Sequence, residues 1–240
     1  MNRLYFGDMH DLFKFDLIRH IMKSMPDLAS FTFVPMLTET EKKNSKKKGP
    51  AKDLKKAWKT GKAGSQNQEL VSSMERLQEI DDDLEYFNGI REYFQKEKIL
   101  VDIIDRPRFT HEKRVQYFQH LFDDFPMHSL IFLDPDTGLE ESSPTQKHLL
   151  LDELKKVYKR IDTGSIIMIY QHFPREDRAG YIKRRCEQLN KLIGEGPVII
   201  TDTEIAFFLI AKNEKIRMRL EQSVENYANC YPALESTACA

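Results

Sequence analysis

The sequence predicts an α/β protein: one domain of residues 1–240, with a mostly parallel sheet flanked by helices and an antiparallel strand pair near the C-terminus. From residue 129 onward, short apolar runs alternate with amphipathic segments of helical length. Two later apolar runs, 197–201 and 205–211, are separated only by three polar residues, which indicates a strand pair. The charged fraction of 31% and the hydrophobic fraction of 40% are typical of globular proteins and argue against a fibrous or disordered chain.

The first half of the chain contains one predicted helix and two predicted strands. Apolar residues recur at helical spacing over residues 11–25, from Leu12 to Met22. Residues 31–37 form a short run rich in β-forming residues, and residues 100–104 form another. We therefore expect a helix followed by two strands in this part of the chain.

The second half of the chain continues the alternation. We expect strands at 129–133, 165–170, 197–201 and 205–211, and helices at 146–161, 179–193 and 214–227. The runs 129–133 and 165–170 are continuous and apolar, and a helical segment follows each of them. They are therefore predicted to be neighbouring parallel strands.

Two carboxylates follow the apolar run 129–133 directly. Asp134 and Asp136 lie in a turn that also contains Pro135 and Gly138. Ligands of open α/β sheets bind just outside the carboxyl ends of the strands, so both aspartates are expected at the mouth of a crevice. The alternative is structural, because Asp side chains also cap turns by accepting hydrogen bonds from their own backbone.

Polar side chains also follow the predicted strand 165–170. Gln171 and His172 are expected at the same sheet edge as Asp136, because the carboxyl ends of parallel strands lie at one edge. Histidine transfers protons near neutral pH or binds metals, and glutamine offers an orienting amide. The alternative is a loop histidine without a task. Lys147 belongs either to this site or to the surface of a helix.

The third group of polar residues lies at the N-terminus. Asp8, Asp11 and Lys14 are spaced at three-residue intervals where the first predicted helix begins. One interpretation is an N-cap at Asp8 with a favourable acid, Asp11, in the first turn. The functional interpretation places these three side chains, with His10 as a fourth candidate, on exposed first turns of the helix.

A lysine-rich segment at about 41–68 interrupts the alternation of strands and helices. Its polarity and its glycines predict a mobile insertion. The run Lys42–Lys62 is a candidate nucleic-acid contact, because a lysine placed on a phosphate releases counterions. The alternative is a solvated loop whose charge is neutralised by the acidic residues 81–85.

Charge and cysteine content narrow the functional classes. The formal net charge of −1 indicates no particular partner. No apolar stretch reaches the ~18 residues needed to span a bilayer, and the first residues lack signal-peptide features, so we expect a cytoplasmic protein without membrane contact. Cys186, Cys230 and Cys239 have no metal-ligand spacing and cannot all pair with one another, which fits a reducing compartment.

Three motifs together support a resemblance: Gly7-Asp8-x-x-Asp11-x-x-Lys14, Leu133-Asp-Pro-Asp-Thr-Gly-Leu-Glu140 and Tyr170-Gln-His172. They resemble an uncharacterised bacterial family over most of the chain. Their order is also similar, more distantly, to the ribosomal-RNA adenine-N6 methyltransferases, in which an opening helix precedes a Rossmann-like domain and a strand ends in Asp-Pro-Pro-Tyr. That resemblance implies an S-adenosylmethionine-type fold, with Asp134 at the amino group of the target base. It also places Asp8, Asp11 and Lys14 near the cofactor and makes residues 197–211 the terminal hairpin.

The sequence departs from the methyltransferase pattern at two places. The expected glycine-rich turn after the first strand is replaced by residues 34–40, which contain no glycine. The Pro-Tyr pair that would stack the base is replaced by Asp136 and Thr137. A second carboxylate removes stacking and adds negative charge, which suits a divalent cation better than a flipped base.

The residues support three functional hypotheses. The first is a methyltransferase-like enzyme that acts on nucleic acid and uses S-adenosylmethionine. The second is a nuclease or phosphoesterase in which Asp134 and Asp136, with Asp8 or Asp11, hold magnesium or manganese and His172 handles protons. The third is a Rossmann-like binding module without catalysis. The order of the motifs favours the first hypothesis.

Overall fold

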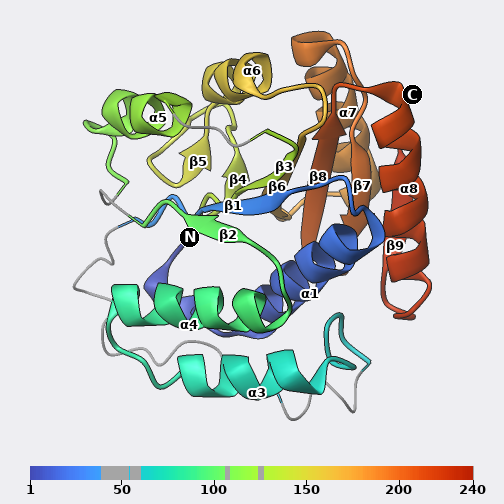
Figure 1. Ribbon diagram of the computed structural model, residues 1–240. Coiled ribbons are helices and arrows are strands. Elements are labelled where there is room, and N and C mark those ends of the chain that lie inside the picture. The colour runs from blue at the N-terminus through green and yellow to red at the C-terminus, as the bar shows by residue number, and fades with distance from the viewer. Residues whose placement is uncertain (39–53, 55–60, 106–108, 124–126, 240) are drawn as a thin grey trace.

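The computed structural model describes residues 1–38, 54, 61–105, 109–123 and 127–239. These residues form a seven-stranded sheet with helices packed around it (Figure 1). In spatial order the strands are β2 (Val101–Ile103), β1 (Ser30–Val34), β3 (Ser129–Leu133), β6 (Ile166–His172), β8 (Ile205–Ala211), β7 (Val198–Thr201) and β9 (Glu235–Ala238). The first four strands are parallel, and β8 and β9 run antiparallel to their neighbours. The predicted mixed α/β class with a mostly parallel sheet is confirmed.

Both predicted strand pairings are present. β3 and β6 are parallel neighbours with Leu130 opposite Ile166, and β7 and β8 are antiparallel with Val198 opposite Leu209. The turn between β7 and β8 is closed by Asp202, whose side chain accepts hydrogen bonds from two backbone N–H groups of the turn. An aspartate that satisfies the backbone in this way is a local turn signal.

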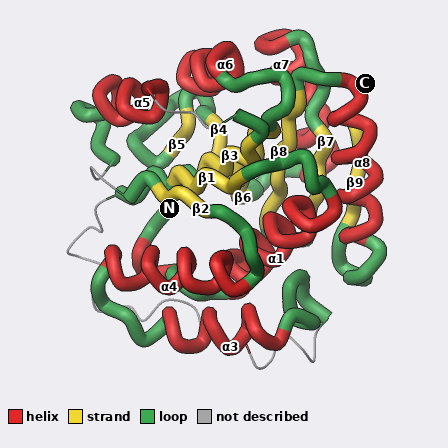
Figure 2. Tube along the Cα trace, in the orientation of Figure 1, coloured by secondary structure: helices red, strands yellow, loops and turns green. Residues whose placement is uncertain are grey.

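Helices cover both faces of the sheet, as the red helices around the yellow strands show (Figure 2). On one face lie α1 (Met9–Ser24), α4 (Asp83–Lys96) and α8 (Glu214–Ala228), with α3 (Gln68–Leu77) packed outside against α1 and α4. On the other face lie α5 (Arg114–Asp123), α6 (Leu151–Arg160) and α7 (Arg178–Ile193). A 3-10 helix (Arg3–Tyr5) precedes α1, and β4 (Gly138–Leu139) pairs with β5 (His148–Leu149).

Alternate residues of the central strands enter two separate apolar cores. Phe33 and Phe132 stack at a centroid distance of 5.4 Å in the core shared with α1, α4 and α8. Ile131 and Leu133 belong to the core shared with α5, α6 and α7. Because both faces of the sheet are covered, the central strands are continuous apolar runs in the sequence.

Several boundaries differ from the predictions for local reasons. β1 ends at Val34 rather than at residue 37, since Pro35 has no N–H to continue the ladder. α6 begins at Leu151 rather than at 146, because residues 148–149 form β5. Three helices, α3, α4 and α5, were not predicted, although the side chains of Asn67 and Asp82 cap the first turns of α3 and α4.

Most of the predicted lysine-rich insertion, residues 41–53 and 55–60, lies outside the described residues. In the described part, Leu54 and Ala63 are buried in the core of α1, so these positions pack although the segment as a whole is polar. Cys186 of α7 and Cys239, the residue after β9, form a disulfide, whereas Cys230 is an exposed free thiol. No helix within the described residues is both long and apolar enough to cross a membrane.

Candidate functional site

The order of the strands places a crevice between the carboxyl ends of β1 and β3. β1 pairs with β2 on one side and with β3 on the other, so the chain builds the sheet outward in two directions from β1. Ligands of open α/β sheets bind at such a switch point. A cavity of about 340 Å³ lies beside this point, at the carboxyl ends of β3 and β6, and its lining includes Asp8, His10, Asp11, Lys14, Asp134, Asp136, Tyr170 and His172.

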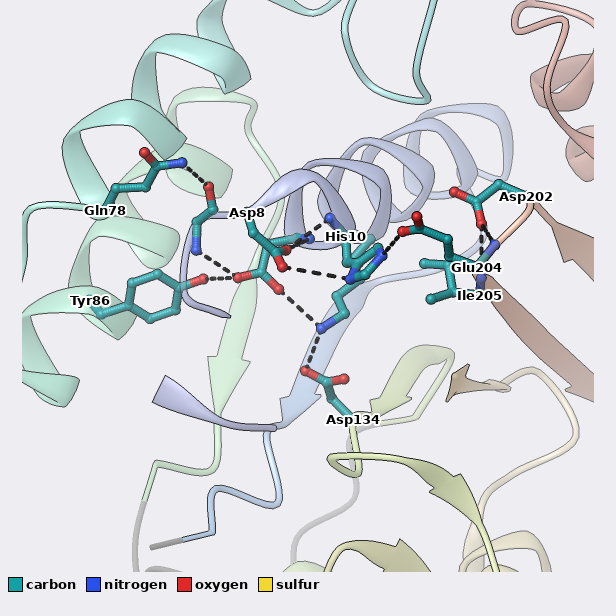
Figure 3. A network of polar contacts seen from close by, with 11 residues as sticks. Asp8, His10, Gln78, Tyr86, Asp134, Asp202, Glu204 and Ile205 are labelled. Carbon is teal, nitrogen blue, oxygen red and sulfur yellow. Dashed lines mark hydrogen bonds and ion pairs between the residues drawn. The ribbon is translucent and has the colours of Figure 1, made fainter. Parts of the chain in front are cut away.

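Lys14 forms the centre of a buried polar network that reaches Asp134 and, through Asp11, Tyr86, both labelled in Figure 3. Its ammonium donates hydrogen bonds to Asp11 Oδ1 at 3.0 Å and to Asp134 Oδ2 at 3.1 Å, and it lies 4.4 Å from the centroid of the Tyr170 ring. Burial alone would lower the pKa of Lys14, but the two carboxylates outweigh burial and raise this pKa well above its usual value. Lys14 is therefore a permanent positive charge between two aspartates.

Asp134 is completely buried, yet one of its carboxylate oxygens has no hydrogen-bond partner among the described residues. Burial raises the pKa of Asp134, and the Lys14 ammonium opposes that rise. The backbone carbonyl of Asp134 accepts a hydrogen bond of 2.8 Å from the Met1 amino group. Buried polar atoms are nearly always satisfied, so the unpaired oxygen marks a place where a ligand donor fits.

The opening turns of α1 are buried, which corrects the expectation of exposed first turns. Asp11 Oδ2 accepts hydrogen bonds from the Tyr86 hydroxyl at 2.7 Å and from the Gly7 N–H at 2.8 Å. Gly7 has a positive φ of 71°, and a Cβ there would crowd Gln78, whose side chain donates to the Gly7 carbonyl. The helices α3 and α4 therefore cover this end of α1 and orient Asp11.

Asp8 both caps α1 and lines the cavity. Its Oδ1 accepts hydrogen bonds from the N–H groups of His10 at 2.8 Å and of Asp11 at 3.1 Å, which confirms the predicted N-cap. Burial, followed by the negative charge of Asp11, raises the pKa of Asp8 to about 6. The structural and the functional interpretations of Asp8 are thus compatible.

The edge of the cavity carries two histidines. The His10 ring lies 6.2 Å from the His172 ring, centroid to centroid, and its Nε2 lies 2.9 Å from Glu204 Oε2 in the turn between β7 and β8. Burial, and then His10, lower the pKa of His172. The pairing of α1 with this turn was not predicted, because residues 10 and 204 are joined only by the tertiary fold.

The structure separates Asp136 from Gln171. Asp136 lines the cavity and lies 3.7 Å from the ammonium of Lys147. Gln171 is buried and is not among the cavity residues. Its amide accepts from the Leu139 N–H at 2.9 Å and donates to the Thr137 carbonyl at 3.0 Å, so it holds the turn that carries Asp136.

The predicted polar groups therefore meet at one edge of the sheet, with Tyr86 and Glu204 as contributors that the sequence interpretation missed. Neither has a local motif that would have revealed it.

Among the described residues, no group of three or more His, Cys, Asp or Glu side chains is arranged to hold a metal ion. The chain matches no protein-family model and no curated protein. Its function is argued from this site.

Proposed function

We propose that the protein is a Rossmann-like, methyltransferase-like enzyme that binds S-adenosylmethionine in the cavity and methylates an amino group of a nucleic acid. The observation that carries this proposal is the unpaired, buried oxygen of Asp134 at the switch point of the sheet. A carboxylate oxygen accepts hydrogen bonds, and an amino group of a base supplies the matching donor. The resemblance described above assigns the same task to Asp134.

The order of the strands supports the methyltransferase-like part of the proposal. β8 runs antiparallel and is inserted between β6 and β7. The resemblance predicts a terminal hairpin over residues 197–211, and β7 and β8 form that antiparallel pair. The adjacent strands β1, β3 and β6 are parallel, so their carboxyl ends provide one common edge for cofactor and target.

The charge of the cavity supports a cationic cofactor. The lining contains four aspartates, at positions 8, 11, 134 and 136, and two lysines, at positions 14 and 147. The sulfonium of S-adenosylmethionine is a cation, and excess carboxylates attract it.

The nucleic-acid part of the proposal rests on the lysines of Lys42–Lys62, among which Lys62 alone belongs to the described residues. The described flanks of this segment lie close to the cavity. The backbone N–H of Thr38 donates to the carbonyl of Met1, a cavity residue, and Lys62 contributes to lowering the pKa of Glu204 after the larger effect of the His10 hydrogen bond. A lysine-rich segment whose described flanks lie beside the cavity suits a phosphate backbone.

The test combines binding with transfer. Isothermal titration should show saturable binding of S-adenosylmethionine, and labelled methyl groups should appear on RNA or DNA. Asp134→Asn should keep cofactor affinity within about threefold and lower transfer by about 100-fold, because it weakens the acceptor of the target amine. The control Asp152→Asn, an exposed aspartate on α6, should behave as wild type.

Other ligands decide between the proposal and its alternatives. Binding of magnesium or manganese with hydrolysis of nucleic acid, and without cofactor binding, would replace the proposal by the metal-dependent nuclease or phosphoesterase. Absence of both cofactor and metal binding would leave the non-catalytic module.

A further inference from the structure

The cavity holds a second polar arrangement that the proposed function does not use. His10 lies between two carboxylates, with Nε2 at 2.9 Å from Glu204 Oε2 and Nδ1 at 3.6 Å from Asp8 Oδ2 (Figure 3). The His10 side chain is 24% exposed and lines the cavity. A carboxylate that accepts from one ring nitrogen leaves the other nitrogen free to accept a proton.

We propose that His10, oriented by Glu204, is the base that takes up the proton released when the target amino group is methylated. This inference rests on the proposed function and deepens it. Glu204 acts as a positioning residue, because its hydrogen bond keeps the proton of neutral imidazole on Nε2. Nδ1 then carries the lone pair on the side of Asp8.

The proton balance of methyl transfer requires such a base. The amino nitrogen of the target forms a new bond to the methyl carbon, and the bond between sulfur and that carbon breaks with its electron pair moving to sulfur. The nitrogen then carries one proton too many. That proton passes to Nδ1 of His10, and the resulting imidazolium lies between the carboxylates of Glu204 and Asp8.

Hydrogen bonds within the turn between β7 and β8 hold the Glu204 backbone in place. Asp202 Oδ1 accepts hydrogen bonds from the N–H groups of Glu204 at 2.7 Å and of Ile205 at 2.8 Å. The Glu204 carbonyl accepts from the Phe173 N–H at 3.0 Å, which ties the turn to the end of β6. Because the Glu204 side chain is 54% exposed, its ion pair adds little to folding, and it offers the proton a route to solvent.

The charged groups around His10 come from three elements. α1 supplies Asp8, the turn between β7 and β8 supplies Glu204, and β6 supplies His172. The charge of Lys62 contributes to lowering the pKa of Glu204. The carboxylates of Asp8 and Glu204 therefore lie next to the two ring nitrogens that carry the protons of the imidazolium.

The test uses the full chain with S-adenosylmethionine and the methyl-accepting nucleic acid. His10→Asn should lower kcat by about 100-fold, should abolish the rise of kcat with pH, and should leave cofactor affinity unchanged. Glu204→Gln should lower kcat less and move the inflection of the pH profile to lower pH, since the imidazolium loses a neighbouring charge. His111→Asn and Glu221→Gln, both at exposed positions, are the matched controls and should resemble wild type.

Nitrogen NMR of the imidazole provides a readout besides activity. Neutral His10 should carry its proton on Nε2 in the wild type and should lose this preference in Glu204→Gln. Unchanged kcat and an unchanged pH profile in His10→Asn would overturn the assigned base while the methyltransferase proposal stands. No transfer by wild type, with the Nε2 tautomer present, would overturn the proposed function and this inference with it.

Discussion

Lys14 and Asp134 lie 120 residues apart in the chain and form an ion pair of 3.1 Å that is nearly shielded from solvent. The side chain of Lys14 is 7% exposed, and that of Asp134 is 0% exposed. Buried charges are tolerated only when they are paired, so this contact requires α1 to lie across the carboxyl end of β3. The pair therefore couples the folding of the opening helix to the assembly of the cavity.

Replacement of Lys14 by methionine should destabilise the protein strongly. Met has a similar length but no charge, so Asp11 and Asp134 would face each other in the interior without a cation. We expect the free energy of unfolding at pH 7 to fall by about 3 to 5 kcal/mol, measured by urea denaturation. Lys147→Met is the control. Its partner Asp136 is 3.7 Å away and Lys147 is 44% exposed, so a change below about 1 kcal/mol is expected.

Asp8→Asn should change stability in a pH-dependent manner. Asn keeps the capping oxygen, so the helix end is preserved. The pKa of Asp8 is raised to about 6 in the folded protein, so the folded state binds this proton more tightly than the unfolded chain does. The stabilising contribution of Asp8 is therefore present below pH of about 4 and is lost as pH rises to about 6.

Denaturation of Asp8→Asn at two pH values checks this sign. The free energy of unfolding of the variant, relative to that of wild type, should be higher at pH 8 than at pH 4 by on the order of 2 kcal/mol, because only the wild type carries the buried charge at pH 8. An equal difference in the free energy of unfolding at both pH values would show that burial and the charge of Asp11 do not raise the pKa of Asp8.

Gly138→Ala should disturb the turn that carries Asp136. Gly138 has a φ of 124°, and a Cβ at this position would overlap the amide of Gln171. We expect a loss of about 2 to 4 kcal/mol in the free energy of unfolding. Gly194→Ala separates the two causes, because Gly194 also has a positive φ of 77° but open space around its Cα. That control should lose about 1 kcal/mol, and an equal loss in both variants would contradict a steric role of Gln171.

The lysine-rich segment can be tested without a description of its structure. Serine at positions 46, 47, 48, 55 and 56 should weaken binding to RNA or DNA and should flatten its dependence on salt concentration, because fewer counterions are released. Thermal unfolding should barely change. Unaltered affinity for RNA and DNA at every salt concentration would show that the segment is a solvated loop without nucleic-acid contact.

The sequence by itself determined the strands that end in polar residues. β3 and β8 were predicted at their observed bounds. A continuous apolar run between two polar turns is the pattern of a strand that is covered on both faces. The position of Asp134 at the carboxyl end of β3 followed directly. The helices α3, α4 and α5 were missed, although the spacing and caps of α3 and α4 are local signals that were available in the sequence.

Only the tertiary structure decided how these groups combine. The packing of Phe13 on Phe207 and of Phe15 on Phe33 sets the path of α1 across the sheet, and that path brings Lys14 to Asp134. The partnership of His10 with Glu204 likewise depends on where a distant turn lies. Local periodicity determines which residues are buried and which end a strand, whereas long-range packing determines which side chains meet, because nothing in the spacing of two distant residues records their contact.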